Sequence, residues 1–181
     1  MRWWPPIGCG RPEMDTRELL RAELEATRAA FHQLLAEVPE SAYCQPSDNP
    51  AWTIGDVLYH LSLAPRLLGA DLRMILNHNW AYRLIPYVVP RALFDGLNAR
   101  LTRFGARRPS RAFFAAAYDR AHRAALRALD SVQEGDWQRQ VFYPDWDPLL
   151  SGAVTVEHLF HYVQRHFDSH AAQIRARLTA P

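Results

Sequence analysis

The sequence predicts an all-α protein, a four-helix bundle with one long crossover between its second and third helices. Apolar residues recur at helical spacing in four segments, helix-capping residues precede several of them, and no strand-like alternation of useful length occurs. A chain of 181 residues that is 49% hydrophobic is enough for one domain with one core. We expect a bundle domain over residues 14–181, after an N-terminal extension over residues 1–13 that is a candidate for disorder.

Capping residues and prolines mark the limits of the first two helices. Residues 15–38 open with an Asp-x-x-Glu pattern typical of a capping box, and their apolar stripe stops at Pro39. Residues 53–77 open in a similar way, with a threonine followed three residues later by Asp56. Because proline lacks an amide hydrogen and crowds the preceding turn, we expect Pro65 to kink this second helix.

A long connection and two further helices complete the predicted bundle. Residues 78–109 contain several prolines and glycines, with room for a short helix over residues 91–104. A connection of this length allows the third helix, residues 110–132, to run parallel to the second. Residues 135–152 are rich in Trp, Pro and Asp, and they lead to a fourth helix over residues 154–178.

The charge balance argues against a nucleic-acid binder. The formal net charge is +2, whereas nucleic-acid-binding domains usually carry a large basic excess. The local exception is the stretch from Arg100 to Arg111, which holds five arginines and no acidic residue. This stretch could steer an anionic substrate or partner, or it could form a solvated connection between helices.

The cysteine content and the hydropathy predict a cytoplasmic location. Only Cys9 and Cys44 occur, with no CxxC pattern, so neither a disulfide framework nor a thiolate metal site is expected. No segment approaches the roughly 20 apolar residues that a membrane span needs. We therefore expect neither a membrane partner nor a nucleic-acid partner.

Two histidines one helical turn apart are the strongest candidate metal ligands. Residues four apart on a helix are rotated by about 40° from each other, so His166 and His170 share one face of the fourth helix. Apolar neighbours on that face direct both imidazoles toward the bundle interior. His60 lies within the apolar stripe of the second helix, and it comes level with the pair if these two helices run antiparallel.

The three histidines have two interpretations. Three imidazoles and one open position form a common zinc site, and imidazole also binds Ni²⁺, Fe²⁺ and Cu²⁺. Alternatively, an inward-facing histidine can be a hydrogen-bonded core residue, and an HxxxH pair can arise by chance in a chain with eight histidines. The spacing by itself leaves both interpretations open.

Two segments around these histidines resemble the motifs of a known family. Residues 49–61, Asn-Pro-Ala-Trp-Thr-Ile-Gly-Asp-Val-Leu-Tyr-His-Leu, resemble the Trp-Thr and Val-Leu-x-His-Leu opening of helix two in the DinB/YfiT-like superfamily of metalloenzymes. Residues 166–174, His-Phe-Asp-Ser-His-Ala-Ala-Gln-Ile, resemble its helix-four motif HxxxHxxQI. Both motifs occur in the expected order and separation, and the resemblance spans roughly residues 15–178.

The resemblance carries implications for fold, cofactor and chemistry. It implies a four-helix bundle with up-down-down-up order, in which His60, His166 and His170 bind one divalent metal ion, with Zn or Ni as the leading candidates. Relatives in this superfamily include S-transferases and isomerases that use a low-molecular-weight thiol. The resemblance therefore also implies such a thiol as a candidate cosubstrate.

Several residues near the motifs bear on the subfamily and on ligand support. Ser169 and Ala172 stand where many family members have a second histidine and a glycine. Asp56, one turn before His60, could orient the imidazole, although its position favours a helix cap. Gln173 could hydrogen-bond a neighbouring ligand or serve in packing.

The other polar candidates receive surface or packing interpretations. We expect Cys44 to be an inert small residue, and nothing in the spacing of Tyr118 and Asp119 singles them out, although both could line a cavity. The remaining histidines are expected at the surface: His32, His78, His122, His158 and His161.

Three functional hypotheses follow from these residues. The first is a metal-dependent enzyme that activates water or a low-molecular-weight thiol for attack on a small electrophilic substrate, as a thiol S-transferase or a hydrolase. The second is a non-catalytic, stress-associated metal-binding protein with a closed site, and the third is a vestigial site. Ferritin-like di-iron chemistry is not expected, because the sequence contains no Glu-x-x-His pair.

Apolar residues in the extension and the crossover indicate a homodimer. Trp3, Trp4, Trp80 and the run over residues 84–89 exceed what a small bundle needs to expose. We expect these residues to form an apolar patch where two copies meet.

Overall fold

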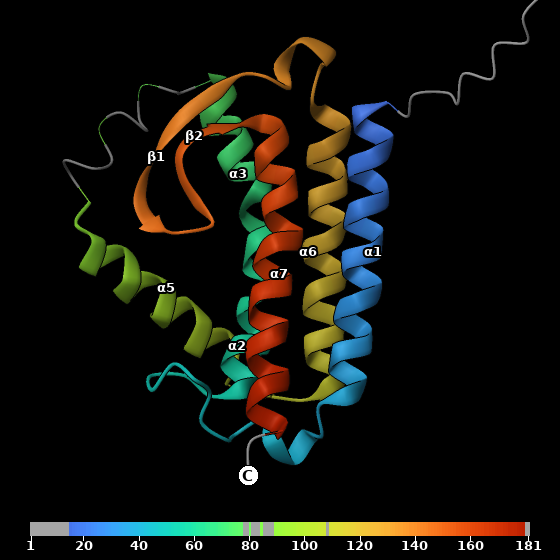
Figure 1. Ribbon diagram of the computed structural model, residues 1–181, viewed down its shortest axis with the longest axis vertical. Helices are drawn as coiled ribbons and strands as arrows, with labels where there is room; N and C mark the ends of the chain where they lie inside the picture. Colours follow the sequence, from blue (N-terminus) through green and yellow to red (C-terminus); the bar gives the residue numbers. More distant parts are fainter. Residues whose placement is uncertain (1–14, 78–79, 81–83, 85–88, 108, 180–181) are drawn as a thin grey trace, which may run out of the picture.

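A computed structural model describes residues 15–77, 80, 84, 89–107 and 109–179. Its bundle consists of α1 (Thr16–Glu37), α2 (Ile54–His60), α3 (Leu63–Asn77), α6 (Arg111–Ser131) and α7 (Val156–Thr179) (Figure 1). Outside the bundle lie the helix α5 (Arg91–Gly105), the strands β1 (Gln140–Asp147) and β2 (Leu150–Thr155), and the short 3₁₀ helices Glu40–Ala42 and Glu134–Asp136. The predicted fold class is therefore confirmed, with a small hairpin added to it.

The bundle has up-down-down-up order (Figure 1). Arg17, at the start of α1, donates to the carbonyl oxygen of Leu129 near the end of α6 over 2.7 Å, so these helices are antiparallel. Arg175, near the end of α7, pairs with Glu37 at the end of α1, so those helices are parallel. The parallel pair α3 and α6 accounts for the long crossover that carries α5.

The predicted second helix is interrupted just before the proline. It divides into α2 and α3 at Leu61 and Ser62, and the Ser62 hydroxyl donates to the carbonyl oxygen of Tyr59 over 2.7 Å. Pro65 falls in the first turn of α3, where the missing amide hydrogen has no helical partner to lose. Pro65 thus marks the start of a new helix, which corrects the expected kink within a continuous one.

The hairpin β1–β2 was not expected from the sequence. The two strands pair antiparallel, with Val141 opposite Val154, and both valines are buried against the bundle. The pairing becomes irregular between Tyr143 and Asp147, and Gly152 adopts a φ of 74° that glycine tolerates. Pro and Asp residues break the alternation of β1, which hides the strand from a search for periodicity.

Two apolar clusters make up the core. One surrounds the region where α2 meets α7, and it includes Phe31, Leu58, Phe114, Tyr118, Phe167 and Ile174. The other lies toward the hairpin, and it includes Leu20, Leu24, Leu72, Leu129 and Val163. Burial of each large side chain contributes about 1.5–3 kcal/mol, so these clusters hold the bundle together and fix the position of α2 against α7.

The helix α5 lies obliquely along the outside of the bundle (Figure 1). Thr102 and Ala106 face the protein, whereas most of its other side chains are exposed. At Gly105, an added Cβ would lie 2.0 Å from ring atoms of Tyr59, so only glycine permits this close approach to α2. None of the helices in the described ranges combines the length and hydropathy that a bilayer span requires.

Candidate metal centre

The fold brings the three predicted histidines together. His60 is the last residue of α2, while His166 and His170 occupy successive turns of α7. The imidazole centroids lie 4.8 Å apart for His60 and His166, 5.0 Å for His60 and His170, and 4.6 Å for His166 and His170. Their potential ligand nitrogens all lie within 4.8 Å of one another, so the group could hold a metal ion.

A capping box sets the position of His60. The Thr53 hydroxyl accepts from the amide of Asp56 over 3.1 Å, and the Asp56 carboxylate accepts from the amide of Thr53 over 2.9 Å. This reciprocal pair starts α2 two turns before the histidine. Asp56 therefore acts as a helix cap, in agreement with the favoured interpretation of its position, and the hydrogen bonds of its carboxylate stay within the cap.

Hydrogen bonds orient two of the three imidazoles. His170 Nδ1 lies 2.9 Å from Oε1 of Gln173, and because that oxygen only accepts, the proton must be on Nδ1. The lone pair of His170 Nε2 is therefore available to a metal ion. His60 Nδ1 lies 3.4 Å from the hydroxyl of Thr102, which the crossover helix α5 places behind the ring. The sequence had indicated Gln173 as a hydrogen-bond partner of a site histidine. It had not indicated Thr102, because no sequence pattern shows that α5 packs on α2.

The two most buried imidazoles face each other. The Nε2 atoms of His60 and His166 lie 3.0 Å apart, while Nδ1 of His166 is buried without a hydrogen-bond partner among the described residues. In a tetrahedral site with Zn–N bonds of about 2.0–2.1 Å, two nitrogens are separated by about 3.3 Å. The observed separation is thus close to what a shared ion requires, and the residues fit a divalent metal.

The surroundings keep all three imidazoles neutral. Burial lowers the pKa of His60 to about 3, with a smaller contribution from the neighbouring His170. Burial, followed by the charges of the other two rings, lowers the pKa of His166 well below its usual value, and burial also lowers the pKa of His170. Neutral imidazole is the form that binds a metal ion, so protonation does not compete with binding near neutral pH.

A cleft of about 280 Å³ reaches the site from the surface. His170 and Gln173 form part of its wall, together with the apolar side chains of Trp52 and Ile174. The Trp52 ring also packs on His60, with centroids 4.7 Å apart. The least buried imidazole of the three is thus the one that borders the cleft, which gives a small molecule access to the site.

The hairpin contributes a polar pair beside the histidines. The Tyr162 hydroxyl donates to the Asp147 carboxylate over 2.6 Å, and the Tyr162 ring lies 5.3 Å from that of His166. Burial and the negative charge of Asp147 raise the pKa of Tyr162, so its hydroxyl stays protonated. There was no sequence signal for Asp147, because the hairpin itself was not expected.

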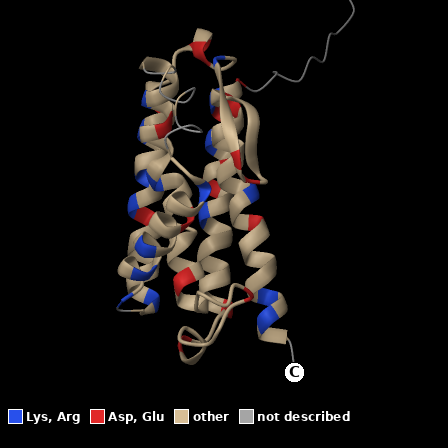
Figure 2. Cartoon of the chain, turned by 90° about the vertical axis from the view of Figure 1, so that its left-hand side faces the viewer, with Lys and Arg blue, Asp and Glu red and all other residues tan. Residues whose placement is uncertain are grey.

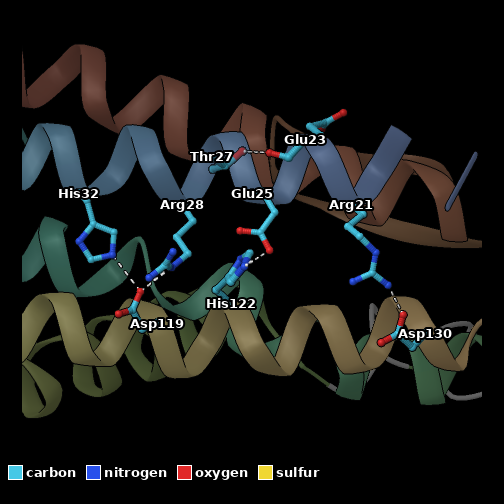
Figure 3. Close-up of polar contacts among 9 residues, drawn as sticks. All are labelled: Arg21, Glu23, Glu25, Thr27, Arg28, His32, Asp119, His122 and Asp130. Atoms are coloured by element: carbon cyan, nitrogen blue, oxygen red, sulfur yellow. Dashed lines mark hydrogen bonds and ion pairs between the residues drawn. The ribbon is translucent and has the colours of Figure 1, made fainter. Parts of the chain in front are cut away.

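Three of the other candidate residues, His32, Tyr118 and Asp119, lie away from the site. Figure 3 shows His32 and Arg28 on α1 directed at Asp119 on α6, with N–O distances of 2.9 and 2.7 Å. Asp119 therefore belongs to an ion-pair network rather than to a cavity. Tyr118 is buried and stacks on Phe31 with centroids 4.0 Å apart.

One expected surface histidine is in the interior. His122 is 5% exposed, and its Nε2 lies 3.1 Å from the Glu25 carboxylate (Figure 3). His122 lies on the side of α6 that packs against α1. The sequence around His122 does not indicate which helix will cover it, so a surface position was expected. His158 and His161 are partly exposed, and His161 pairs with Glu23 over 2.8 Å, while Cys44 is exposed and free. His78 lies outside the described residues.

Comparisons with known proteins identify the family and a similar fold. A family model described as the DinB superfamily matches residues 23–174. Among solved structures, the chain is similar to YfiT from Bacillus subtilis, with 16% sequence identity and a TM-score of 0.63 over 98% of this chain and 95% of that chain. That protein is described as a probable metal-dependent hydrolase with an unusual four-helix bundle topology. At this identity the likeness shows the fold. No curated protein sequence matches the chain.

Proposed function

Because the chain belongs to the DinB superfamily, we propose that it is a metal-dependent enzyme in which His60, His166 and His170 bind one divalent ion, with Zn or Ni as the leading candidates. The observation that carries this proposal is the convergence of three neutral imidazoles next to a cleft. Three protein ligands leave one position for a water or a substrate, as in many catalytic zinc sites. A non-catalytic site would instead be closed by a fourth protein ligand.

Each residue around such a site has a separate role. A bound divalent ion supplies Lewis acidity, which lowers the pKa of a water or thiol at its open position. Gln173 holds the proton of His170 on Nδ1, and Thr102 supports His60 from behind. These contacts fix the tautomer and the ring orientation that a ligand needs. Trp52 and Ile174 shield one side of the cleft from water.

The proposed reaction is attack of an activated water or low-molecular-weight thiol on a small electrophilic substrate. The cleft of about 280 Å³ has the dimensions for a small molecule rather than for a polymer. Apolar walls at Trp52 and Ile174 favour a substrate with an apolar portion, and Arg177 at the rim offers a guanidinium to an anionic group. A cytoplasmic location would provide a thiol cosubstrate and keep the exposed Cys44 reduced.

Metal content tests the proposed ligands directly. Mass spectrometry on protein purified without chelators should find about one divalent ion per chain in the wild type. His60→Ala, which leaves two imidazoles, and the double variant His166→Ala, His170→Ala, which leaves one, should lose it, because so few ligands rarely retain an ion against exchange. His158→Ala, a partly exposed histidine on the same helix, is the matched control and should keep its metal.

Turnover distinguishes the catalytic from the non-catalytic interpretation. Wild-type protein reloaded with zinc or nickel should hydrolyse model esters or amides, or transfer a thiol to an electrophile such as a chlorinated aromatic compound. Both activities should vanish after chelation. A metal-loaded protein that catalyses neither reaction would support the stress-associated metal-binding role. Metal retained in both histidine variants would remove the proposed site altogether.

A further inference from the structure

The outer face of α5 carries large apolar side chains that are exposed and do not pack in the core of the described residues. Leu93, Leu97, Leu101 and Phe104 have exposed fractions between 46% and 65%. Their spacing of four, four and three residues places them in a single stripe along the helix. Trp80 and Leu84, in the segment that leads to α5, are exposed as well. A soluble surface helix normally turns such a stripe inward, so this face is unusual.

The inner face of α5 explains why the apolar stripe points outward. Thr102 and Ala106 are buried, and Gly105 lies directly against the ring of Tyr59. Thr102 and Ala106 occupy the side of the helix opposite to the leucines, and Gly105 lies between the two sides. The helix therefore packs on the bundle through its small and polar residues, and its apolar face remains available to a partner.

A row of arginines borders the apolar stripe. Arg100, Arg103 and Arg107 follow one another at spacings of three and four residues and are exposed. None of the three forms an ion pair with the part of the chain that the structure describes. Arg107 lies over the ring of Phe104, 4.3 Å from its centroid, and with the other two it surrounds an open groove of about 460 Å³. Figure 2 shows this side of the molecule, where every blue residue is an arginine because the chain has no lysine.

We propose that α5 binds the surface of a lipid bilayer that contains anionic lipids. A helix with leucine and phenylalanine on one face and arginines along its border can lie in the plane of the membrane interface. The apolar side chains enter the boundary between headgroups and acyl chains, while the guanidinium groups pair with lipid phosphates. This binding requires no membrane span and is independent of the metal site.

The charges of α5 favour a lipid surface over a second copy of the chain. The sequence from Gly96 to Tyr118 contains no acidic residue. Asp95, the acid of this helix, already lies 3.7 Å from Arg91. In a two-fold contact between copies, the arginines of one α5 would thus meet no carboxylate from the other α5. An anionic bilayer supplies the missing negative charge.

Vesicle binding tests the proposal with the full chain. Wild-type protein should co-sediment with vesicles made of equal parts phosphatidylcholine and phosphatidylglycerol, and much less with phosphatidylcholine alone. Arg100→Gln with Arg103→Gln should weaken partitioning roughly 25-fold, since each arginine near an anionic surface contributes about a factor of five. Leu97→Ser with Phe104→Ser should weaken it at least roughly tenfold, because less apolar area enters the bilayer.

Matched controls separate α5 from the rest of the surface. Arg123→Gln with Arg127→Gln removes two exposed arginines of α6, and Leu19→Ser with Leu67→Ser removes two exposed leucines of α1 and α3. Both control variants should bind like the wild type. Circular dichroism and thermal unfolding of every variant show whether a loss of binding reflects a loss of fold.

Three results would overturn the proposal. The first is absence of binding to both vesicle types by folded wild-type protein. The second is equal binding to both types, which would remove any role for the arginines. The third is a concentration-dependent dimer, detected by analytical ultracentrifugation, that the Leu97→Ser, Phe104→Ser variant converts to monomer, because a second copy would then occupy this face.

Discussion

At the scale of single residues, the site depends on a side chain from outside the bundle. Thr102 belongs to α5, is fully buried, and places its hydroxyl 3.4 Å from Nδ1 of His60. If Nε2 of His60 is the ligand atom, Nδ1 carries the proton and donates it to this hydroxyl. A contact of this kind raises the basicity of the ligand and holds its ring in place.

Removal of the hydroxyl should weaken metal binding while the fold remains. Thr102→Val has nearly the same shape, and we expect it to reduce zinc affinity roughly 10- to 100-fold. Competition with a fluorescent chelator measures this affinity. Thr102→Ser keeps the hydroxyl and should restore most of the loss. Equal affinities for all three proteins, with unchanged circular dichroism, would show that the threonine only fills space.

Asp119 connects α1 and α6 through a pH-dependent contact. The Arg28 guanidinium, and then His32, hold the pKa of this carboxyl at about 2, below its usual 3.8. A carboxyl whose pKa is lowered by folding contributes stability above its unfolded pKa and loses that contribution as the pH falls toward the folded pKa. We expect Asp119→Asn to lower the free energy of unfolding by roughly 1 kcal/mol or less near neutral pH, because the pair is partly solvated.

Urea unfolding at several pH values measures this contribution. The difference between wild type and Asp119→Asn should shrink as the pH falls from about 3.8 to about 2. Asp130→Asn is the control, because Asp130 also joins α6 to α1, through Arg21, but is more exposed than Asp119 (Figure 3). If the difference in free energy of unfolding stays constant from about pH 3.8 to about pH 2, the ionised Asp119 carboxylate does not stabilise the fold.

At the scale of the elements, α5 and the hairpin depend on close contacts with the bundle. Gly105 brings α5 against Tyr59, and the Tyr162–Asp147 hydrogen bond joins the hairpin to α7. The Phe94 and Trp146 rings, with centroids 4.9 Å apart, link the two elements to each other. On one side of the bundle, α5 thus packs against α2 and the hairpin against α7, and these two elements supply Thr102 and Asp147 to the surroundings of the histidines.

Substitution at Gly105 should destabilise the protein. The methyl group of Gly105→Ala would overlap the Tyr59 ring, and displacement of this buried ring costs roughly 1–3 kcal/mol. Gly96→Ala, on the same helix with open space around the new Cβ, is the matched control. It should be neutral or stabilising by about 1 kcal/mol or less, because alanine favours helix more than glycine does. Thermal unfolding of both variants compares them, and equal midpoints would contradict the proposed contact.

At the scale of the whole molecule, chain order determines which helices can share a site. The parallel arrangement of α3 and α6 requires a long connection, and it leaves α7 antiparallel to α2. His60, late in α2, then comes level with His166 in the middle of α7. In an ordinary up-down-up-down bundle the short connections would leave no place for α5. The proposed ligands and the proposed lipid-binding face therefore both follow from one topological choice.

Much of this structure could be predicted from local sequence. Capping residues and apolar spacing predicted α1, α6 and α7 to within a few residues, since a helix is set by contacts between residues three and four positions apart. The predicted crossover had room for a short helix where α5 lies. The same spacing placed His166 and His170 on one inner face and His60 within the apolar stripe of the second helix, and the motif resemblance implied that the three bind one metal ion. Gln173 was recognisable as a neighbour of His170 for the same reason, as it lies one turn away on the same helix.

Tertiary structure decided everything that depends on a distant partner. The strand β1 exists because Val141 packs on the bundle and pairs with Val154, although one proline and two aspartates obscure its pattern. His122 is buried because α1 brings Glu25 to it, and Thr102 supports His60 because α5 folds back across α2. The sequence by itself thus determined most of the helices and the spacing of His166 and His170 on one face, which depend on short-range geometry. The contacts that surround and orient the site depend on chain topology, which no local window contains.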